Sequence, residues 1–411
     1  MQPVRMPYLG IIDDALIQWW YWTGHLTEKN PRADEAPRRF GFELVFFLVA
    51  PRELCRGGHG AELYAELGKA AVRQVYDTLR EAGDPKGILS LFELGAELDD
   101  VLMAALKAGR LADGLPDVSL SGHLALNMAH LALTDIDAQT FYKDVMIWPG
   151  NYTPGERNRV DLSTPWSGRK VTATGEMGPN PDGSDGQSVR LSGQHRDFSI
   201  ELTVNDPRPA DIHYGGERHA YDFGGDTWYY SRTSMKVDSG TVTVGGRDYA
   251  VEGDIWFDRQ AGGLVRAVRN GWQWFAIQLD DDVQIMLFFF NEASGASERI
   301  ASVTVGGTST QLSASEFEVT WGPETWKSPA SRVKYPQAWT VNITPTKPIP
   351  GFTPRTLKIA SQVDDQEIVV FPELLRYWEG ACTVSDDAGS TIGKAYAELL
   401  PKPGCHRFQQ D

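Results

Sequence analysis

Polar and apolar positions alternate strictly in two runs, GDIWFDRQAG (253–262) and GWQWFAIQL (271–279), which predicts two extended strands. One face of the first run carries carboxyl, indole and amide groups, namely Asp254, Trp256, Asp258 and Gln260. One face of the second run carries indole and amide groups, namely Trp272, Trp274 and Gln278. Glycines in the short connection indicate an antiparallel hairpin. We therefore expect these side chains to line one cavity.

Similar alternation over most of the chain predicts a mainly β protein. Residues 17–26 (IQWWYWTGHL) place Trp20 and Trp22 on one face of a strand, and residues 39–49 form the next strand. The run TWYYSR places Trp228 and Tyr230 together on one face. Gly-Gly pairs at 245–246 and 306–307 lie between alternating runs and are typical of hairpin turns.

Two segments lack this alternation of polar and apolar residues. Residues 53–114 are rich in Ala, Leu, Glu and Lys with apolar residues three and four apart, which predicts amphipathic helices inserted between strands. The insertion could be a lid over a barrel mouth, a packing appendage or a dimer surface. Residues 151–188 are rich in Pro, Gly, Asp and Asn and indicate a long connection full of turns.

Composition limits the classes of partner. The net charge is -16, from 39 basic and 55 acidic residues, so nucleic acid is an unfavourable partner. Neither a secretory leader nor an apolar run of the ~20 residues that span a bilayer is recognisable. An odd number of cysteines, three, argues against a disulfide framework. We expect a soluble, cytoplasmic protein that contacts membranes only peripherally, if its ligand is a lipid. The sequence leaves the oligomeric state open.

The candidate chemistry is acid catalysis beside aromatic rings. A carboxyl group among ring faces is poorly solvated and tends to stay protonated, as a general acid must be. Asp258 is the first candidate for this acid and Asp254 the second. Ring faces can stabilise a carbocation. The candidate residues for binding a hydrophobic substrate are Trp20, Trp22, His25, Trp228, Tyr230, Trp256, Gln260, Trp272, Trp274 and Gln278.

Structural roles remain open for the same residues. Tryptophan in strands often serves only to bury a large surface, and the aspartates could pair with Arg259, Arg266 or Arg269. His25 could line a cavity or merely end its strand. Glu379 in YWEG is expected to pair with an arginine and close the second half of the fold.

Several other chemistries lack their motifs. His123 and His130 fall on opposite faces of one continuous strand, and no other His, Cys or carboxylate cluster has ligand spacing, so we predict no metal. Phosphate-binding and dinucleotide-binding glycine motifs are missing, so we predict no cofactor. There is no GxSxG nucleophile motif, and Ser231 has no obvious histidine partner.

A series of motifs resembles, in order, the AttH and carotenoid hydratase (hydroxyneurosporene synthase) superfamily of lipocalin-like proteins. The series covers nearly the whole chain outside residues 53–114. Its members are WWYWTGHL, RFGFELVFF, HLALTDI, WYYSRTSM, GDIWFDRQAG, GWQWFAIQL, YPQAWTV, YWEG and GKAYAELL.

The resemblance implies two lipocalin-like antiparallel β-barrel domains side by side, with a ligand cavity and without a cofactor. We place the domains at residues 1–210, with the helical insertion at about 53–114, and at residues 211–411. By position in an aromatic-x-Asp-His-Asn-like motif, Asp258 corresponds to the proposed proton donor of carotenoid hydratases. Arg259 and Gln260 replace the His and Asn of that motif.

Three functions follow as hypotheses. The first is acid-catalysed hydration of an isoprenoid or polyene alkene, with Asp258 as the proton donor. The second is a pericyclase or cyclase that holds a polyene in a reactive conformation. The third is a carrier of a lipid or pigment without catalysis. The fold alone does not choose among them.

Overall fold

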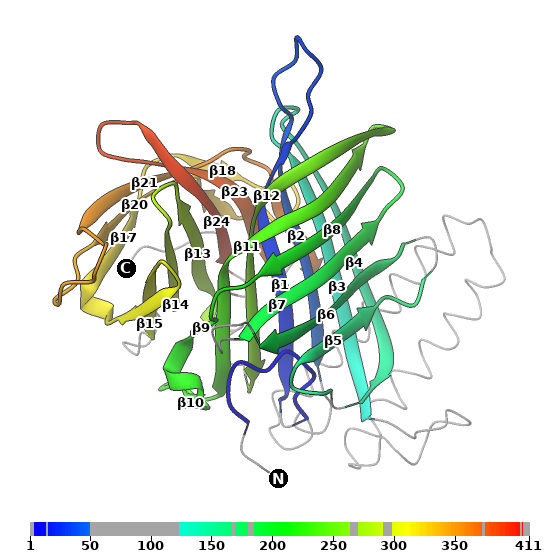
Figure 1. Cartoon of the computed structure of the whole chain (residues 1–411), viewed down its shortest axis with the longest axis horizontal. Coiled ribbons are helices and arrows are strands. Elements are labelled where there is room, and N and C mark those ends of the chain that lie inside the picture. The colour runs from blue at the N-terminus through cyan, green and yellow to red at the C-terminus, as the bar shows by residue number, and fades with distance from the viewer. Residues whose placement is uncertain are drawn as a thin grey trace.

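The computed structural model describes residues 4–13, 15–49, 123–153, 155–166, 169–179, 185–263, 270–290, 298–371, 375–402 and 405. The predicted helical insertion at 53–114 lies outside this part of the chain. About two thirds of the described residues belong to the strands of two large antiparallel sheets that curl side by side (Figure 1). The predicted fold class, mainly β with two lipocalin-like units, is confirmed.

The first sheet has twelve strands among the described residues, in the order β4-β3-β2-β1-β12-β11-β8-β7-β6-β5, with β9 and β10 paired to β11. Its strands are β1 (Ile17–Glu28), β2 (Arg39–Val49), β3 (His123–Asp135), β4 (Thr140–Tyr152), β5 (Arg159–Ser163), β6 (Val171–Pro179), β7 (Asp185–Gln194), β8 (Phe198–Asp206), β9 (Asp211–Ile212), β10 (His219–Ala220), β11 (Asp226–Val244) and β12 (Arg247–Gly262). A 3-10 helix, η1 (His213–Gly216), lies between β9 and β10.

The second sheet has ten described strands in the order β16-β15-β14-β13-β24-β23-β21-β20-β17, with β22 paired to β23. A small separate hairpin joins β18 and β19, and η2 is a 3-10 helix. The bounds of these elements are β13 (Trp272–Leu279), β14 (Val283–Phe290), β15 (Arg299–Val305), β16 (Thr308–Leu312), η2 (Ala314–Glu316), β17 (Phe317–Trp321), β18 (Thr325–Lys327), β19 (Lys334–Pro336), β20 (Ala338–Ile343), β21 (Arg355–Ser361), β22 (Glu367–Phe371), β23 (Leu375–Ser385) and β24 (Thr391–Leu400).

Each sheet curls around a core of its own because alternate residues of its strands point inward. The first core joins side chains from β2 and β3 to side chains from β6, β7 and β8 near the opposite edge. The second core is built in the same way from the inward-pointing side chains of the second sheet. The predicted Gly-Gly turns at 245–246 and 306–307 are confirmed, since all four glycines have positive φ and join paired strands.

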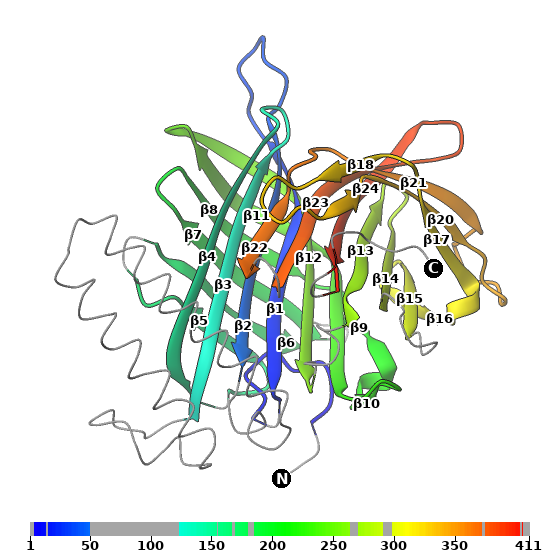
Figure 2. The ribbon, with the colours of Figure 1, turned by 180° about the vertical axis from the view of Figure 1, so that it is seen from behind.

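A third apolar layer lies between the two sheets, where β1 faces β24 and β2 faces β23 (Figure 2). It consists mainly of aromatic side chains from the outward faces of both sheets. The two sheets therefore pack through the strand faces that do not contribute to their own cores. This layer contains the site described below.

The predicted hairpin of residues 253–262 with 271–279 is wrong. The strand β12 pairs with β1 and β11 in the first sheet, whereas β13 pairs with β14 and β24 in the second. The two strands belong to different sheets, and their indole faces meet across the layer between the sheets. Trp256 and Trp274 contact edge to face, with ring centroids 6.1 Å apart.

Two further expectations concern the chain between the predicted strands. The long connection predicted at 151–188 is wrong, because β5, β6 and the start of β7 lie there. Those strands lie at or near the sheet edge opposite β4, where glycine and proline are better tolerated. The domain boundary near Asp211 stays a prediction. The change from one sheet to the other comes later, between β12 and β13.

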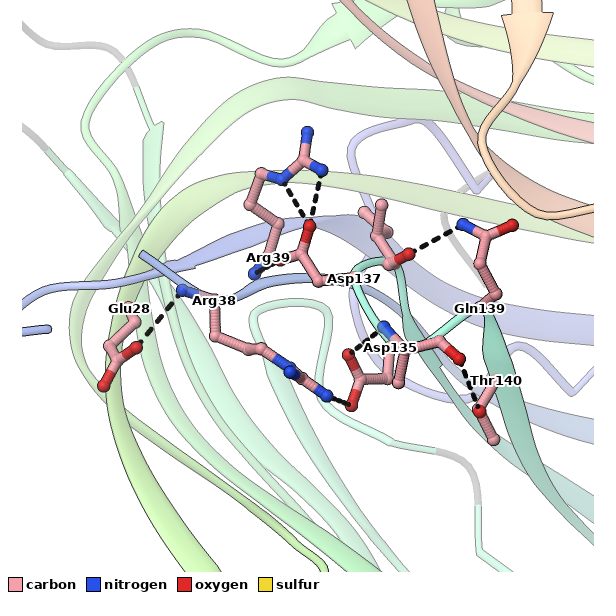
Figure 3. A network of polar contacts seen from close by, with 9 residues as sticks. Glu28, Arg38, Arg39, Asp135, Asp137, Gln139 and Thr140 are labelled. Carbon is pink, nitrogen blue, oxygen red and sulfur yellow. Dashed lines mark hydrogen bonds and ion pairs between the residues drawn. The ribbon is translucent and has the colours of Figure 1, made fainter. Parts of the chain in front are cut away.

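A polar network fixes one end of the first sheet. Arg38 forms an ion pair with Asp135 at 2.6 Å, and Arg39 pairs with Asp137 (Figure 3). The Oδ1 atom of Asp135 also accepts a bond from the backbone N–H of residue 138. These contacts hold the beginning of β2 against the turn between β3 and β4.

Among the described residues, no helix is long and apolar enough to cross a bilayer.

Candidate functional site

Two rows of side chains face each other across the layer between the sheets. In the first sheet, the register places Tyr21 beside Asp258 and Asp258 beside Ser231. In the second sheet, Glu379 pairs with Glu398, and Glu398 pairs with Trp274. The strand register, rather than closeness in sequence, therefore brings these carboxyl groups into one site.

Asp258 is the centre of the first row. Asp258 is 4% exposed, and three hydrogen-bond donors contact its carboxyl group. The Ser231 hydroxyl donates to Oδ1 at 2.5 Å, the Trp256 indole N–H donates to Oδ1 at 2.8 Å, and the Tyr229 hydroxyl donates to Oδ2. The Trp274 N–H in turn donates to the Tyr229 hydroxyl at 3.1 Å. The carboxyl group is thus held in a fixed orientation.

Burial raises the pKa of Asp258, and the hydrogen bonds from Ser231 and Tyr229 oppose that rise. Asp254 lies on the same face of β12, as predicted, but at the outer surface. Its carboxylate is partly exposed and forms an ion pair with Lys236. Alternation therefore grouped the two aspartates correctly, and only Asp258 faces the layer between the sheets.

The second row and Glu43, which lies on β2 of the first sheet, together form a wall of carboxyl groups around the same cavity as Asp258. The Tyr21 hydroxyl donates to Glu379, and the Tyr377 hydroxyl donates to Glu43 at 3.2 Å. Glu379 and Glu43 are hydrogen-bonded to each other. The predicted pairing of Glu379 with an arginine is wrong. The side chain of Glu379 points into the layer between the sheets, where it meets Tyr21 and Glu43.

Burial is also the main reason why the acids of this wall hold their protons. The pKa of Glu43 rises to about 8, through burial and then through the neighbouring charge of Glu398. The pKa of Glu398 also rises to about 8, through burial. The pKa of Glu379 rises well above its usual range, through burial and the charge of Glu43. At neutral pH the wall is therefore rich in protonated carboxyl groups.

A cavity of about 30 Å³ lies between the two rows. One water molecule needs roughly 10–15 Å³ on this measure, so the cavity has room for about two. It is lined by Trp19, Tyr21, Glu43, Val45, Phe47, Tyr229, Asp258, Gln260, Trp272, Trp274, Phe288, Tyr377, Glu379 and Glu398. Four carboxyl groups and a layer of aromatic rings thus surround a very small space.

The structure brings some of the predicted binding residues to this cavity. Gln260, Trp272 and Trp274 line it, and Trp256 lies directly behind Asp258. The amide nitrogen of Gln260 donates to the Tyr221 hydroxyl at 3.2 Å. These four residues come from the two strand faces that the alternation singled out.

Other predicted binding residues do not reach the cavity. Four of them point into the core of the first sheet, namely Trp20, Trp22, Trp228 and Tyr230. His25 lies in the layer between the sheets but bonds the backbone carbonyl of Ala395 at 2.9 Å. The amide nitrogen of Gln278 donates to the backbone carbonyl of Thr233 at 2.8 Å. The alternation correctly divided the side chains of each strand between two faces, but it did not show which face points into the core of the sheet.

The sequence interpretation missed several residues that line the cavity. Trp19, Tyr21 and Tyr229 are the immediate neighbours of the residues that were chosen. Glu43 and Glu398 each stand in an otherwise apolar run, FELVFF and AYAELL. An acidic residue among buried apolar neighbours is unusual, and this signal could have identified both.

Ser231 does have a histidine partner, contrary to expectation. The Nε2 atom of His213, in η1, lies 2.8 Å from the Ser231 hydroxyl oxygen. Both residues are fully buried, and neither lines the cavity. The two residues are 18 positions apart, and the two-residue strand β9 and the irregular η1 place them together. No sequence motif records such a contact.

Metal-binding geometry is not found in the described part of the chain. No group of three or more His, Cys, Asp or Glu residues there has an arrangement that could hold a metal ion. The carboxyl groups around the cavity instead bond to hydroxyl groups, indole groups and each other.

Comparison with known proteins identifies the family. The AttH-like family model matches residues 121–401, which is more than half of the chain. The chain belongs to the AttH-like family. This finding agrees with the resemblance in the sequence and covers most of both sheets. Curated protein sequences give no match.

Two solved structures share the fold of this AttH-like protein. An AttH protein from Nitrosomonas europaea is 20% identical with a TM-score of 0.64, and the match covers 98% of each chain. Kievitone hydratase from Nectria haematococca is 15% identical with a TM-score of 0.57, covering 98% of this chain and 96% of the other. At these identities the likeness shows the fold alone.

Proposed function

We propose that the chain is a cofactor-independent hydratase that adds water to an alkene of a hydrophobic isoprenoid or polyene, with Asp258 as the proton donor. The observation that carries this proposal is the buried carboxyl group of Asp258, held among aromatic rings at the edge of a small cavity. A protonated carboxyl group in that place can transfer its proton to an alkene carbon.

The first step forms a C–H bond as the O–H bond of Asp258 breaks and the alkene π electrons take the proton. The positive charge that develops on the second carbon faces the rings of Trp274 and Tyr229. Ring faces stabilise a nearby cation by about 0.5–2 kcal/mol each, more when water is excluded.

The second step adds water to the cation and releases one proton. The cavity has room for about two water molecules. Gln260 lines the cavity, with its amide nitrogen bonded to Tyr221, and its amide oxygen can orient the attacking water. The proton lost by the water returns to the Asp258 carboxylate, which restores the acid. The overall change is the addition of water alone.

The family match and the fold support the proposal of a hydratase. The AttH-like match and the likeness to kievitone hydratase, a protein named as a hydratase, favour hydration over other reactions of a hydrophobic cavity. The layer of aromatic side chains between the sheets favours an apolar substrate.

The decisive experiment compares Asp258→Asn with Asp254→Asn. Each variant is incubated with an acyclic carotenoid and with a prenylated phenol in heavy water, and the products are analysed by mass spectrometry. We expect the wild type to add water with one deuterium on carbon, and Asp258→Asn to lose about 10²- to 10⁴-fold in kcat. Asp254→Asn keeps its activity because Asp254 lies outside the cavity.

Other outcomes separate the alternatives. A product of unchanged mass that forms equally well with Asp258→Asn indicates a cyclase or pericyclase. A ligand that binds and stays unchanged indicates a carrier. Circular dichroism and the thermal midpoint of each variant show whether a loss of activity reflects a loss of fold.

A further inference from the structure

A chain of hydrogen bonds runs from Asp258 away from the cavity. Ser231 donates to the Oδ1 atom of Asp258 at 2.5 Å, and the Nε2 atom of His213 lies 2.8 Å from the Ser231 oxygen. The Nδ1 atom of His213 lies 3.4 Å from the amide oxygen of Gln311. Gln311 is exposed, whereas the other three are buried. The chain therefore connects the buried acid to the surface.

The surroundings of Gln311 decide the protonation state of one ring nitrogen. The amide nitrogen of Gln311 donates to Asp211 at 3.2 Å, so its amide oxygen faces His213. The carboxylate of Asp211 is also bonded by Ser302 and Ser309 at 2.5 Å each, which holds this group in place. A carbonyl oxygen opposite Nδ1 requires a proton on Nδ1. Only Nε2 of His213 is then free to gain or lose a proton.

With Nδ1 protonated, His213, Ser231 and Asp258 have two arrangements that contain the same number of protons. In one, His213 is an imidazolium, Nε2 donates to Ser231, Ser231 donates to Asp258, and Asp258 is ionised. In the other, the Nε2–H bond has broken, Ser231 has taken that proton and passed its own to Asp258, and both end groups are neutral. Two short hydrogen bonds join these states without any movement of heavy atoms.

We propose that His213 and Ser231 form a proton relay with Asp258, so that the acid of the site is the three-residue unit and not Asp258 alone. This proposal rests on the proposed function for its role in turnover, although the relay itself can be tested without substrate. Neither His213 nor Ser231 lines the cavity, so both act only through Asp258. This position also argues against Ser231 as a nucleophile.

A purely structural role for His213 is the competing interpretation. The ring packs against Tyr229 with centroids 4.2 Å apart, and this contact alone could hold the Tyr229 hydroxyl on Asp258. The ionisable groups around His213 are Tyr229 on β11, Asp258 on β12 and, through Gln311, Asp211 on β9. A test must therefore separate proton sharing from packing.

The substrate-free test measures the histidine ring and the Asp258 carboxyl group together. Nuclear magnetic resonance of protein with isotope-labelled histidine and aspartate follows the Nε2 atom of His213 and the carboxyl carbon of Asp258 against pH. The relay predicts that both signals change with one common midpoint and that Ser231→Ala gives them separate midpoints. Separate midpoints in the wild type would overturn the relay.

The kinetic test uses His213→Gln, because a glutamine amide can keep the hydrogen bond to Ser231 but cannot carry the proton. A proton that two sites share is lost at a higher pH than a proton on one of them alone. We expect the alkaline limb of the kcat/KM profile to move to lower pH in His213→Gln. His195→Gln, in the turn between β7 and β8, serves as the control. An unchanged profile in His213→Gln would leave His213 with a packing role only.

Ser231→Ala and Ser231→Thr provide a second pair if His213→Gln does not fold. Threonine keeps the hydroxyl and should restore the wild-type profile, whereas alanine should behave as His213→Gln does; equal profiles for the two variants would contradict the relay. A common midpoint in a protein that adds no water to either alkene supports the relay and refutes the hydratase. Hydration with separate midpoints supports the hydratase and refutes the relay.

Discussion

At the scale of single residues, position along one strand decides what a carboxyl group can do. Asp254 and Asp258 lie on the same face of β12, yet one pairs with Lys236 at the surface and the other is enclosed between the sheets. Glu398 shows the enclosed case in its simplest form. Burial keeps it protonated, and the Trp272 indole donates to its carboxyl group. Such groups couple folding to pH.

Glu398→Gln should make the free energy of unfolding less sensitive to pH between about 4.5 and 8. The pKa of Glu398 is about 8 in the folded protein and near its ordinary value of 4.5 in the unfolded chain. Between these values folding must take up a proton, so this group's contribution to the free energy of unfolding is full below pH 4.5 and falls as pH rises towards 8, by about 1.4 kcal/mol per pH unit. Urea unfolding at closely spaced pH values measures this slope.

The comparison between variants measures this effect together with the lowered pKa of Glu43 and Glu379, which lose the neighbouring charge of Glu398 and so also weaken the pH dependence. His25 and His130, whose pKa values fall to about 4 and about 3 through burial, give a slope of the opposite sign below pH 6.5. That slope is common to the wild type and Glu398→Gln and cancels in the difference. Glu201→Gln, at an exposed position of β8, controls for the loss of one acidic charge. A difference between wild type and Glu398→Gln that does not vary with pH would contradict the buried, protonated state.

At the scale of elements, the site depends on how closely β2 and β23 approach each other. A Cβ atom built on Gly41 lies 2.7 Å from the Cβ atom of Ala381, on the facing sheet. This separation is far below a normal contact between carbon atoms. Glycine at position 41 therefore allows the two sheets to pack at the distance that puts Glu43 beside Glu379.

Gly41→Ala should push the two sheets apart. Overpacking of this kind costs about 1–3 kcal/mol of the free energy of unfolding, and it should also weaken the contact between Glu43 and Glu379. Adding Ala381→Gly removes the facing methyl group and should restore the stability. Gly178→Ala is the matched control, since a Cβ atom there meets no atom within 4 Å. Unchanged stability in Gly41→Ala would mean that the sheets adjust freely.

The strands also show which structural features the sequence pattern could predict and which it could not. Alternation identified both faces of β1, β11, β12 and β13, and paired glycines gave two turns. It did not show that Tyr21, rather than Trp20, faces the second sheet, because the two faces of β1 are equally aromatic. Nor could it place Glu398 beside Asp258, because that neighbourhood depends on which strands pair over more than a hundred residues.

At the scale of the whole molecule, the size of the cavity conflicts with the size of the proposed substrate. Pockets for drug-sized ligands hold roughly 300–1,000 Å³, which is about 10 to 30 times the 30 Å³ found here. An isoprenoid or polyene can therefore reach Asp258 only if side chains between the sheets move. The stacked pair of Trp19 and Trp272, with centroids 6.2 Å apart, lines the cavity and is slightly exposed. It is the best candidate for the part that moves.

Trp272→Ala should therefore bind a bulky apolar ligand more tightly than the wild type while it unfolds more easily. Truncating a buried tryptophan costs about 3–5 kcal/mol of stability, and the freed space adjoins the cavity. Trp339→Ala is the matched control, because Trp339 is buried in the core of the second sheet and does not line the cavity. Fluorescence titration with an acyclic carotenoid measures the affinity, and thermal unfolding measures the stability. If both variants lose stability but neither binds more tightly, the ligand does not enter between the sheets, and Asp258 cannot be its proton donor.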